Sequence, residues 1–230
     1  MQRSISPRIK LADLVASDIF LLSVVHRLGI PFGFGDDTVS EVCRRHGISP
    51  ALFQVLSKTY SDAGYDPAGD LKGLGRDDLP VIVGFLKASH AHYVNACFPT
   101  LHSDIHKMLE GCDKATADIM NRFFDDYEKE ELNHFRYEEQ TVFPCVAALL
   151  EGSVKLEGYE GVAGQFEENH HNIGSHLNDL KNLLVKYIST PQPSDVQMRV
   201  LEQIYSIEAD TKRHAAIEEK VLLPLVMKLL

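Results

Sequence analysis

Apolar residues recur with the 3.6-residue period of an α-helix along most of the last two thirds of the chain. The pattern predicts four long helices, at roughly 78–110, 114–151, 159–188 and 194–229. Alternating patterns of the kind that predict β-strands are nearly absent. We therefore expect an all-α fold.

A stretch rich in glycine and proline precedes the first long helix and predicts a change of domain. We expect a small helical domain at 1–64, a linker at 65–77 and a helical bundle at 78–230. Within the small domain, Thr38 and Glu41 have the spacing of a capping box and predict a helix that begins there.

Ionisable side chains interrupt the apolar faces of all four long helices. His90, for example, lies four residues after Leu86 and four before Val94, and we expect these two apolar residues on the buried face. A buried ionisable group is costly unless it is paired or bound to a metal ion. The residues that share this property are His90, His134, Glu138, His170, His214 and Glu218.

The same residues repeat at an offset of 80 positions, and Pro144 repeats as Pro224. Each half holds a histidine followed 44 residues later by a His-x-x-x-Glu pair, whose two side chains share one helix face. This spacing predicts a duplicated helical hairpin. Two hairpins form an up-down four-helix bundle in which every helix contributes to one central site. The two prolines should kink their helices.

Four imidazoles and two carboxylates suit a pair of metal ions. Each ion would take two nitrogen ligands, and the carboxylates would bridge the ions. Mixed nitrogen and oxygen ligands suit iron, manganese or zinc. Open coordination positions would admit oxygen, nitric oxide or water. The alternatives are a metal-free helical interaction module and a dizinc hydrolase, although no separate general base or nucleophile motif supports the hydrolase.

Residues next to this set offer further candidates. His90 and His170 correspond to each other in the repeat. Their neighbours His92 and His171 do not correspond to a histidine, so we favour His90 and His170 as ligands. We expect His102 and His106 to be surface or packing residues, and their helical spacing offers an extra metal site as the alternative. Glu139 and Glu219 also repeat, and we expect them to be solvated or to support the ligands. For Tyr93 and Tyr127 the two alternatives are packing in the core and hydrogen bonding to the ligands.

The net charge of −10 argues against binding to nucleic acid or to an anionic membrane, because both need a positive surface. The four cysteines are far apart and form no Cys-x-x-Cys pair, which indicates a reduced chain rather than a disulfide framework. No apolar run is long enough to span a bilayer. We therefore expect a soluble protein located in the cytoplasm.

The segments His134–Pro144 and His214–Pro224 resemble the paired His-x-x-x-Glu helices of the hemerythrin-like family, whose domain binds cations. The resemblance covers about 78–230. Oxygen-carrying hemerythrins are less similar, because their third helix has His-x-x-x-His, and Gly174 stands at that offset from His170. Four histidines with two glutamates are closer to the Repair of Iron Centres branch.

This resemblance implies a non-haem di-iron protein of the oxidative and nitrosative stress response. Such a protein would bind O2, NO or a peroxide at two iron ions, or donate iron to damaged iron–sulfur centres. The branch also implies an N-terminal helical domain in which many members carry adjacent cysteines. The corresponding turn here is Gly29–Gly35, which has no cysteine. The domain would then dock a partner protein or a second copy of the chain, and the alternative function is a di-iron sensor of gas or iron that signals through this domain.

Overall fold

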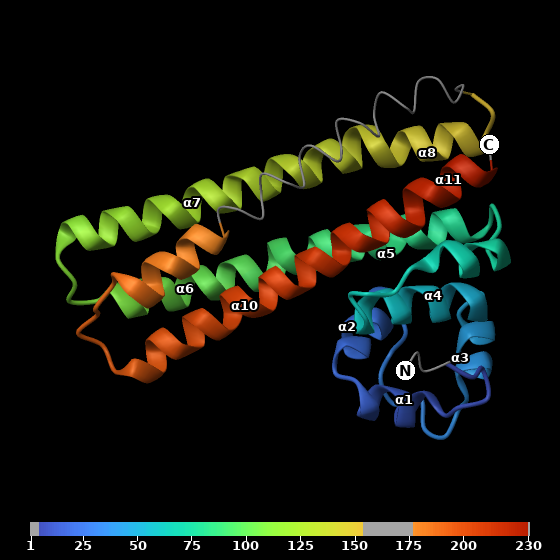
Figure 1. The fold of residues 1–230 in the computed structure, drawn as a ribbon, viewed down its shortest axis with the longest axis horizontal. Coiled ribbons are helices and arrows are strands. Elements are labelled where there is room, and N and C mark those ends of the chain that lie inside the picture. The colour runs from blue at the N-terminus through green and yellow to red at the C-terminus, as the bar shows by residue number, and fades with distance from the viewer. Residues whose placement is uncertain (1–4, 154–176, 230) are drawn as a thin grey trace. The chain divides into compact units, whose positions relative to one another are not determined.

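The computed structural model describes residues 5–153 and 177–229, and all regular elements in these two ranges are helical. The described chain packs into two compact units. The first comprises residues 5–89, 146–153 and 213–229, and the second comprises 90–145 and 177–212. Figure 1 shows the elements in chain order.

The first unit begins with four short helices, whose ends follow from local chemistry. They are α1 (Leu11–Ser17), α2 (Phe20–Arg27), α3 (Val39–Arg45) and α4 (Pro50–Ser61). The predicted capping box forms: the Glu41 N–H donates to Thr38 Oγ1, and the Thr38 N–H donates to the Glu41 carboxylate. Gly47 follows the end of α3 with a φ of +67°, a conformation that glycine adopts without steric cost.

The segment predicted as a linker contains a 3₁₀ helix, η1 (Pro67–Gly73). Its Leu71 side chain is buried, and η1 packs against α4 within the first unit. The unit also holds η4 (Glu218–Leu222), α11 (Leu223–Leu229) and most of α5 (Asp78–His92).

The second unit is built on α6 (Phe98–Leu109), α7 (Lys114–Tyr137) and most of α10 (Ser194–Ile217), and these helices lie side by side in Figure 1. Together with the helical residues 177–186, they surround one hydrophobic core. Four helical segments therefore pack as a bundle, as the periodicity predicted. The remainder of the third predicted helix, at 159–176, lies outside the described residues. The fully buried aromatic residues of this core are Tyr93, Phe98, Phe124 and Tyr127.

Three of the long predicted helices are each interrupted by a single π-helical turn. These turns are η2 (Tyr93–Cys97), η3 (Glu138–Val142) and η4 (Glu218–Leu222). In each case the first residue of the turn accepts a hydrogen bond from the N–H five positions later. A proline follows two residues after each turn, at Pro99, Pro144 and Pro224, and proline lacks the N–H that a regular helical bond needs. α8 (Phe143–Leu150) continues the helix after η3.

The π turn η2 corrects one expectation about the buried face of the first long helix. Val94 was expected on that face, but its side chain is 37% exposed, and the neighbouring Tyr93 is fully buried instead. A π turn holds one residue more than a regular α-helical turn, so it rotates the residues that follow about the helix axis.

Candidate metal centre

In the second unit, two imidazoles approach opposite oxygens of one buried carboxylate. The distance from His90 Nε2 to Glu138 Oε2 is 3.0 Å, and the distance from His134 Nε2 to Glu138 Oε1 is also 3.0 Å. The exposed fractions of these three residues are 6% or less. His134 and Glu138 are one helical turn apart, so the predicted His-x-x-x-Glu geometry forms.

The first unit contains the corresponding pair from the second repeat. His214 Nε2 lies 3.1 Å from Glu218 Oε1, and both side chains are buried. This pair lies at the point where α10 ends and η4 begins. The local geometry of the His-x-x-x-Glu pair is therefore the same in both repeats.

Both glutamates are the first residues of π turns, Glu138 in η3 and Glu218 in η4. π turns are rare and occur frequently at functional sites, because the added residue re-aims the side chains around it. The turns lie at the same offset of 80 positions as the ligand candidates. Local backbone geometry and candidate donor residues are therefore duplicated together.

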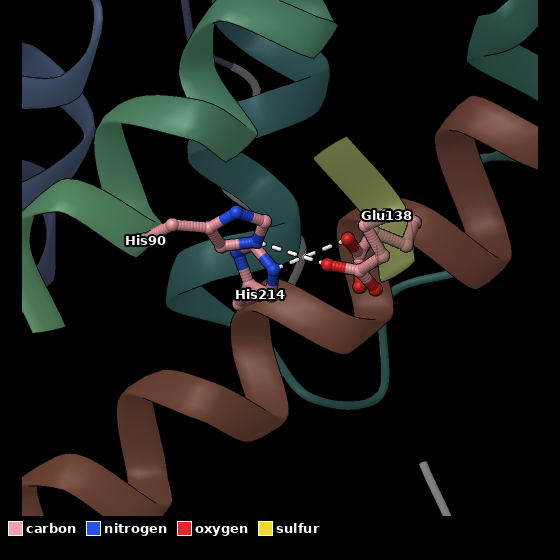
Figure 2. A group of neighbouring side chains, drawn as sticks. His90, Glu138 and His214 are labelled. Atoms are coloured by element: carbon pink, nitrogen blue, oxygen red, sulfur yellow. Dashed lines mark ion pairs between the residues drawn. The ribbon is translucent and has the colours of Figure 1, made fainter. Parts of the chain in front are cut away.

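Four of the predicted residues come together in one group. One donor atom from each of His90, Glu138, His214 and Glu218 lies within 4.8 Å of every other. Figure 2 draws this group, with the His90 imidazole directed toward the Glu138 carboxylate. His134 joins the group through its contact with Glu138. The sixth predicted residue, His170, lies outside the described residues.

The donor chemistry of the group fits a divalent cation. Two ligand atoms that bind one ion at about 2.1 Å with a right angle between them are about 3 Å apart. The Nε2-to-carboxylate distances of 3.0 to 3.1 Å match this separation. The donors are nitrogen and oxygen atoms without sulfur, the set that suits iron, manganese or zinc. The residues present therefore fit a resident metal ion.

Glu139 orients one of these imidazoles. Its Oε1 atom lies 2.9 Å from His90 Nδ1, on the side of the ring opposite Glu138. When Nδ1 carries the proton and donates it to Glu139, the lone pair of Nε2 points toward the metal position. A carboxylate in this position fixes the tautomer of the imidazole and raises its basicity toward a metal. Of the two roles expected for Glu139, the structure thus shows the supporting one.

Aromatic rings and a cavity surround His90. Its imidazole stacks on Phe135 at a centroid distance of 4.3 Å and on Phe143 at 5.8 Å. A cavity of about 390 Å³ lies beside the ring, and its lining includes Phe135, Arg136 and Glu139. Because Glu139 is 45% exposed in its side chain, this cavity gives solvent access to the carboxylate that holds His90.

Two buried tyrosines of the second unit donate hydrogen bonds to carboxylates. The Tyr93 hydroxyl donates to Asp210 Oδ2 at 2.7 Å, and the Tyr127 hydroxyl donates to Glu131 Oε1 at 2.9 Å. Burial first, and then the nearby Glu131 carboxylate, raise the pKa of Tyr127 well above its ordinary value. Both tyrosines were predicted as candidates, but the acceptor of Tyr93 was not, because Asp210 is 117 positions away in the sequence.

The other histidine pair expected as a candidate does not acquire further ligands. The rings of His102 and His106 lie 5.2 Å apart, and both residues are exposed. Among residues 5–153 and 177–229, the group around Glu138 is the one set of three or more such donors close enough to share an ion.

An all-α bundle with a buried group of histidines and glutamates defines a cation-binding helical protein. The family model of the hemerythrin HHE cation binding domain matches residues 81–226. The chain therefore belongs to the hemerythrin HHE family. A search of curated proteins finds no match. No helix in the described part of the chain has the length and hydropathy needed to cross a bilayer.

Proposed function

We propose that this chain is a non-haem di-iron protein of the oxidative and nitrosative stress response. In this proposal it binds O2, NO or a peroxide at two iron ions, or donates iron for the repair of iron–sulfur centres, as in the Repair of Iron Centres branch. The observation that carries the proposal is the buried group of imidazoles and carboxylates around Glu138. A cytoplasmic location fits this activity.

The repeat suggests how the donors are shared between the ions. His90, His134 and Glu138 would come from the first repeat, and His170, His214 and Glu218 from the second. These six side chains would hold the two ions. Iron is favoured over manganese or zinc by the resemblance to the di-iron branch.

The chain itself supplies the setting for this chemistry. Bound iron would supply the binding and reduction of small oxygen or nitrogen ligands. The buried position of the donors excludes bulk water, and Glu139 holds the Nδ1 proton of His90. The nearby cavity offers a small molecule an approach to the His90 side of the group.

Metal analysis after anaerobic reconstitution with ferrous iron tests the proposal. We expect about two iron ions per chain, and a loss of iron in His134→Ala and in His214→Ala. His106→Ala is the matched control, because this exposed histidine should leave the iron content unchanged. Less than about one metal ion per chain in the unmodified protein would refute the dimetal site. Optical spectra recorded after separate additions of NO and O2 then distinguish a carrier from an iron donor.

A second candidate function is a sensor of gas or iron, and one set of contacts in the first unit favours it. Arg213 precedes the ligand candidate His214, and its guanidinium lies 3.7 Å from the ring centroid of Phe20 in α2. Its Nε–H also donates to the Tyr60 carbonyl oxygen of α4 at 2.7 Å. A movement of His214 would therefore reach the N-terminal helices through one neighbouring side chain.

Thiol chemistry in the N-terminal helices is a weaker explanation. Cys43 is the one cysteine of residues 1–64, and burial raises the pKa of its thiol to about 12. A protonated, buried thiol is a poor metal ligand. The sensor predicts that iron loading changes hydrogen exchange in residues 20–27, and that Arg213→Ala removes this change while iron still binds. Unchanged exchange in the unmodified, iron-loaded protein would count against the sensor.

A further inference from the structure

A stack of aromatic rings leads away from His90 within the second unit. The His90 imidazole lies 4.3 Å from the Phe135 ring with an interplanar angle of 16°. Phe135 in turn lies 5.7 Å from Tyr93, with an angle of 22°. Stacked π-systems at these separations are in or near van der Waals contact. The Tyr93 phenol is therefore one ring removed from an imidazole of the candidate metal centre.

Tyr93 has a proton acceptor in place. Its hydroxyl donates to Asp210 Oδ2 at 2.7 Å, and the tyrosine is fully buried. A tyrosine that only needs a hydrogen bond can use any carbonyl oxygen. A carboxylate can also take the proton when the phenol is oxidised, because the pKa of an oxidised phenol is far lower than that of the phenol itself.

A second buried tyrosine with a carboxylate acceptor lies farther along this series of rings. Phe98 lies 6.4 Å from Tyr93 and 6.0 Å from Tyr127. Tyr127 is buried as well, and its hydroxyl donates to the carboxylate of Glu131 at 2.9 Å. Two buried tyrosines, each paired with a carboxylate, thus lie on one continuous aromatic path.

We propose that Tyr93 is a redox-active tyrosine that removes an oxidising equivalent from the metal centre, and that Tyr127 is the next electron donor along the aromatic path. The proposal rests on the proposed function, because the oxidant is iron that a peroxide has oxidised. In the step, Tyr93 gives one electron to that iron and its hydroxyl proton to Asp210. The products are iron lowered by one oxidation level, a neutral tyrosyl radical and a protonated Asp210.

The cycle closes when a one-electron reductant such as ascorbate reduces the radical and Asp210 returns the proton. The same step can be repeated between the two phenols: Tyr127 gives an electron to the Tyr93 radical and a proton to Glu131, while Asp210 re-protonates Tyr93. The ligands would thereby be protected from oxidation when peroxide arrives in excess.

The alternative is that both tyrosines only pack and hydrogen bond in the core. For Tyr127 the repeat argues against this alternative, because the described core of the second repeat has no tyrosine–carboxylate pair at the corresponding positions. The position that corresponds to Tyr127 is Ile207, and the position that corresponds to Glu131 is Thr211. The bundle therefore does not need a tyrosine–carboxylate pair at this level for packing.

Freeze-quench electron paramagnetic resonance of the iron-loaded chain tests the proposal. After hydrogen peroxide is added, we expect a tyrosyl signal that narrows when the protein is made with ring-deuterated tyrosine. Tyr93→Phe should lower the signal at the earliest time point at least tenfold, and Asp210→Asn should lower it similarly. Tyr205→Phe is the matched control, because this tyrosine is 52% exposed and should leave the signal unchanged.

Iron content and circular dichroism, measured on the same samples, distinguish a loss of the radical from a loss of iron or of helical structure. A variant that keeps its iron and helicity but loses the radical supports the proposal. An iron-loaded protein that consumes peroxide without a tyrosyl signal, or with a signal that survives Tyr93→Phe, overturns the redox role and leaves the di-iron proposal standing. A chain that binds no iron overturns both.

Discussion

The two His-x-x-x-Glu turns have the same geometry in different surroundings. In the first repeat, His134 Nε2 lies 3.0 Å from Glu138 Oε1, and in the second, His214 Nε2 lies 3.1 Å from Glu218 Oε1. Each glutamate begins a π turn. What surrounds the two pairs differs: Phe135 and Phe143 of the first repeat correspond to Ala215 and Leu223 of the second.

This difference separates what a bound metal requires from what the rest of the protein adds. Ligand spacing, π turn and proline are common to both repeats, so we attribute them to the geometry of metal binding. The stacked rings around His90, the supporting contact from Glu139 and the paired tyrosines are described in the first repeat. We attribute these to control of reactivity on one side of the centre. Matched changes in the two repeats test this division.

Deletion of Gln140 should have the largest effect, because it removes the additional residue of the π turn η3. The helix can then return to α-helical bonding except at Pro144, which has no N–H to donate, and the Glu138 carboxylate is reoriented. We expect the iron affinity to fall at least 100-fold with the helix content retained. Iron binding by titration and helicity by circular dichroism measure the two effects.

Deletion of Lys220 is the matched change in the second repeat, because both deleted residues are exposed and occupy the same position of their π turns. If the turns serve the metal, the two deletions should weaken iron binding to a similar extent. Full iron binding by either variant would show that its π turn only accommodates the proline that follows.

Phe135→Ala should have the next largest effect. The ring is 5% exposed and stacks on His90, so its removal leaves a cavity in the core and frees the imidazole to rotate. Truncation of a buried phenylalanine costs about 3–5 kcal/mol in the free energy of unfolding. Urea denaturation of the metal-free chain measures this cost, and Phe135→Leu is the control that fills most of the volume. A cost below about 1 kcal/mol for the alanine variant would contradict the packing role.

Glu139→Gln should have a smaller and more specific effect. The amide retains the size of the side chain but no longer places a negative charge beside His90 Nδ1. Loss of such a supporting carboxylate typically lowers metal affinity 10–100-fold. Iron titration under competition from a chelator measures the loss. Glu219→Gln is the matched change, and it tests whether a glutamate also supports a ligand in the second repeat. An unchanged iron affinity in Glu139→Gln would refute the orienting role.

Most of the helical fold follows from periodicity and local chemistry. The predicted helices at 78–110, 114–151 and 194–229 correspond to α5 through α6, α7 through α8 and α10 through α11. The exception is Val94, because a π turn changes the helical register and periodicity assumes a constant 3.6 residues per turn. The domain division at 65–77 stays a prediction.

The site was predictable only as far as spacing is repeated. An offset of 80 positions identified His90, His134, Glu138, His214 and Glu218. One donor atom from each of four of them lies within 4.8 Å of the others, and His134 contacts Glu138. The acceptor of Tyr93 was not predictable, because Asp210 is 117 positions away and reaches Tyr93 only through packing between helices. Glu131 lies one helical turn after Tyr127, so its spacing is compatible with the observed bond, but no motif records it. The metal and the full ligand set stay predictions.

Glu208→Gln should have the smallest effect, and it depends on pH. Burial opposes the ionisation of Glu208, but hydrogen bonds from Lys181 and Lys212 outweigh burial and lower its pKa below the ordinary value of 4.5. A lowered pKa in the folded state means that the ionised form stabilises the fold above pH 4.5, and that this contribution disappears as the pH falls through the folded-state pKa.

The Glu208→Gln variant should therefore lose about 1 kcal/mol of stability at pH 7 and almost nothing near pH 2, as measured by urea denaturation at both values. Glu128→Gln, at the matching position of the first repeat, is the control and should change stability by less than about 0.5 kcal/mol. Equal losses in the two variants would show that the outer faces of the repeats are equivalent. A loss confined to Glu208 would show that the repeats diverged on their outer faces as well as around the metal.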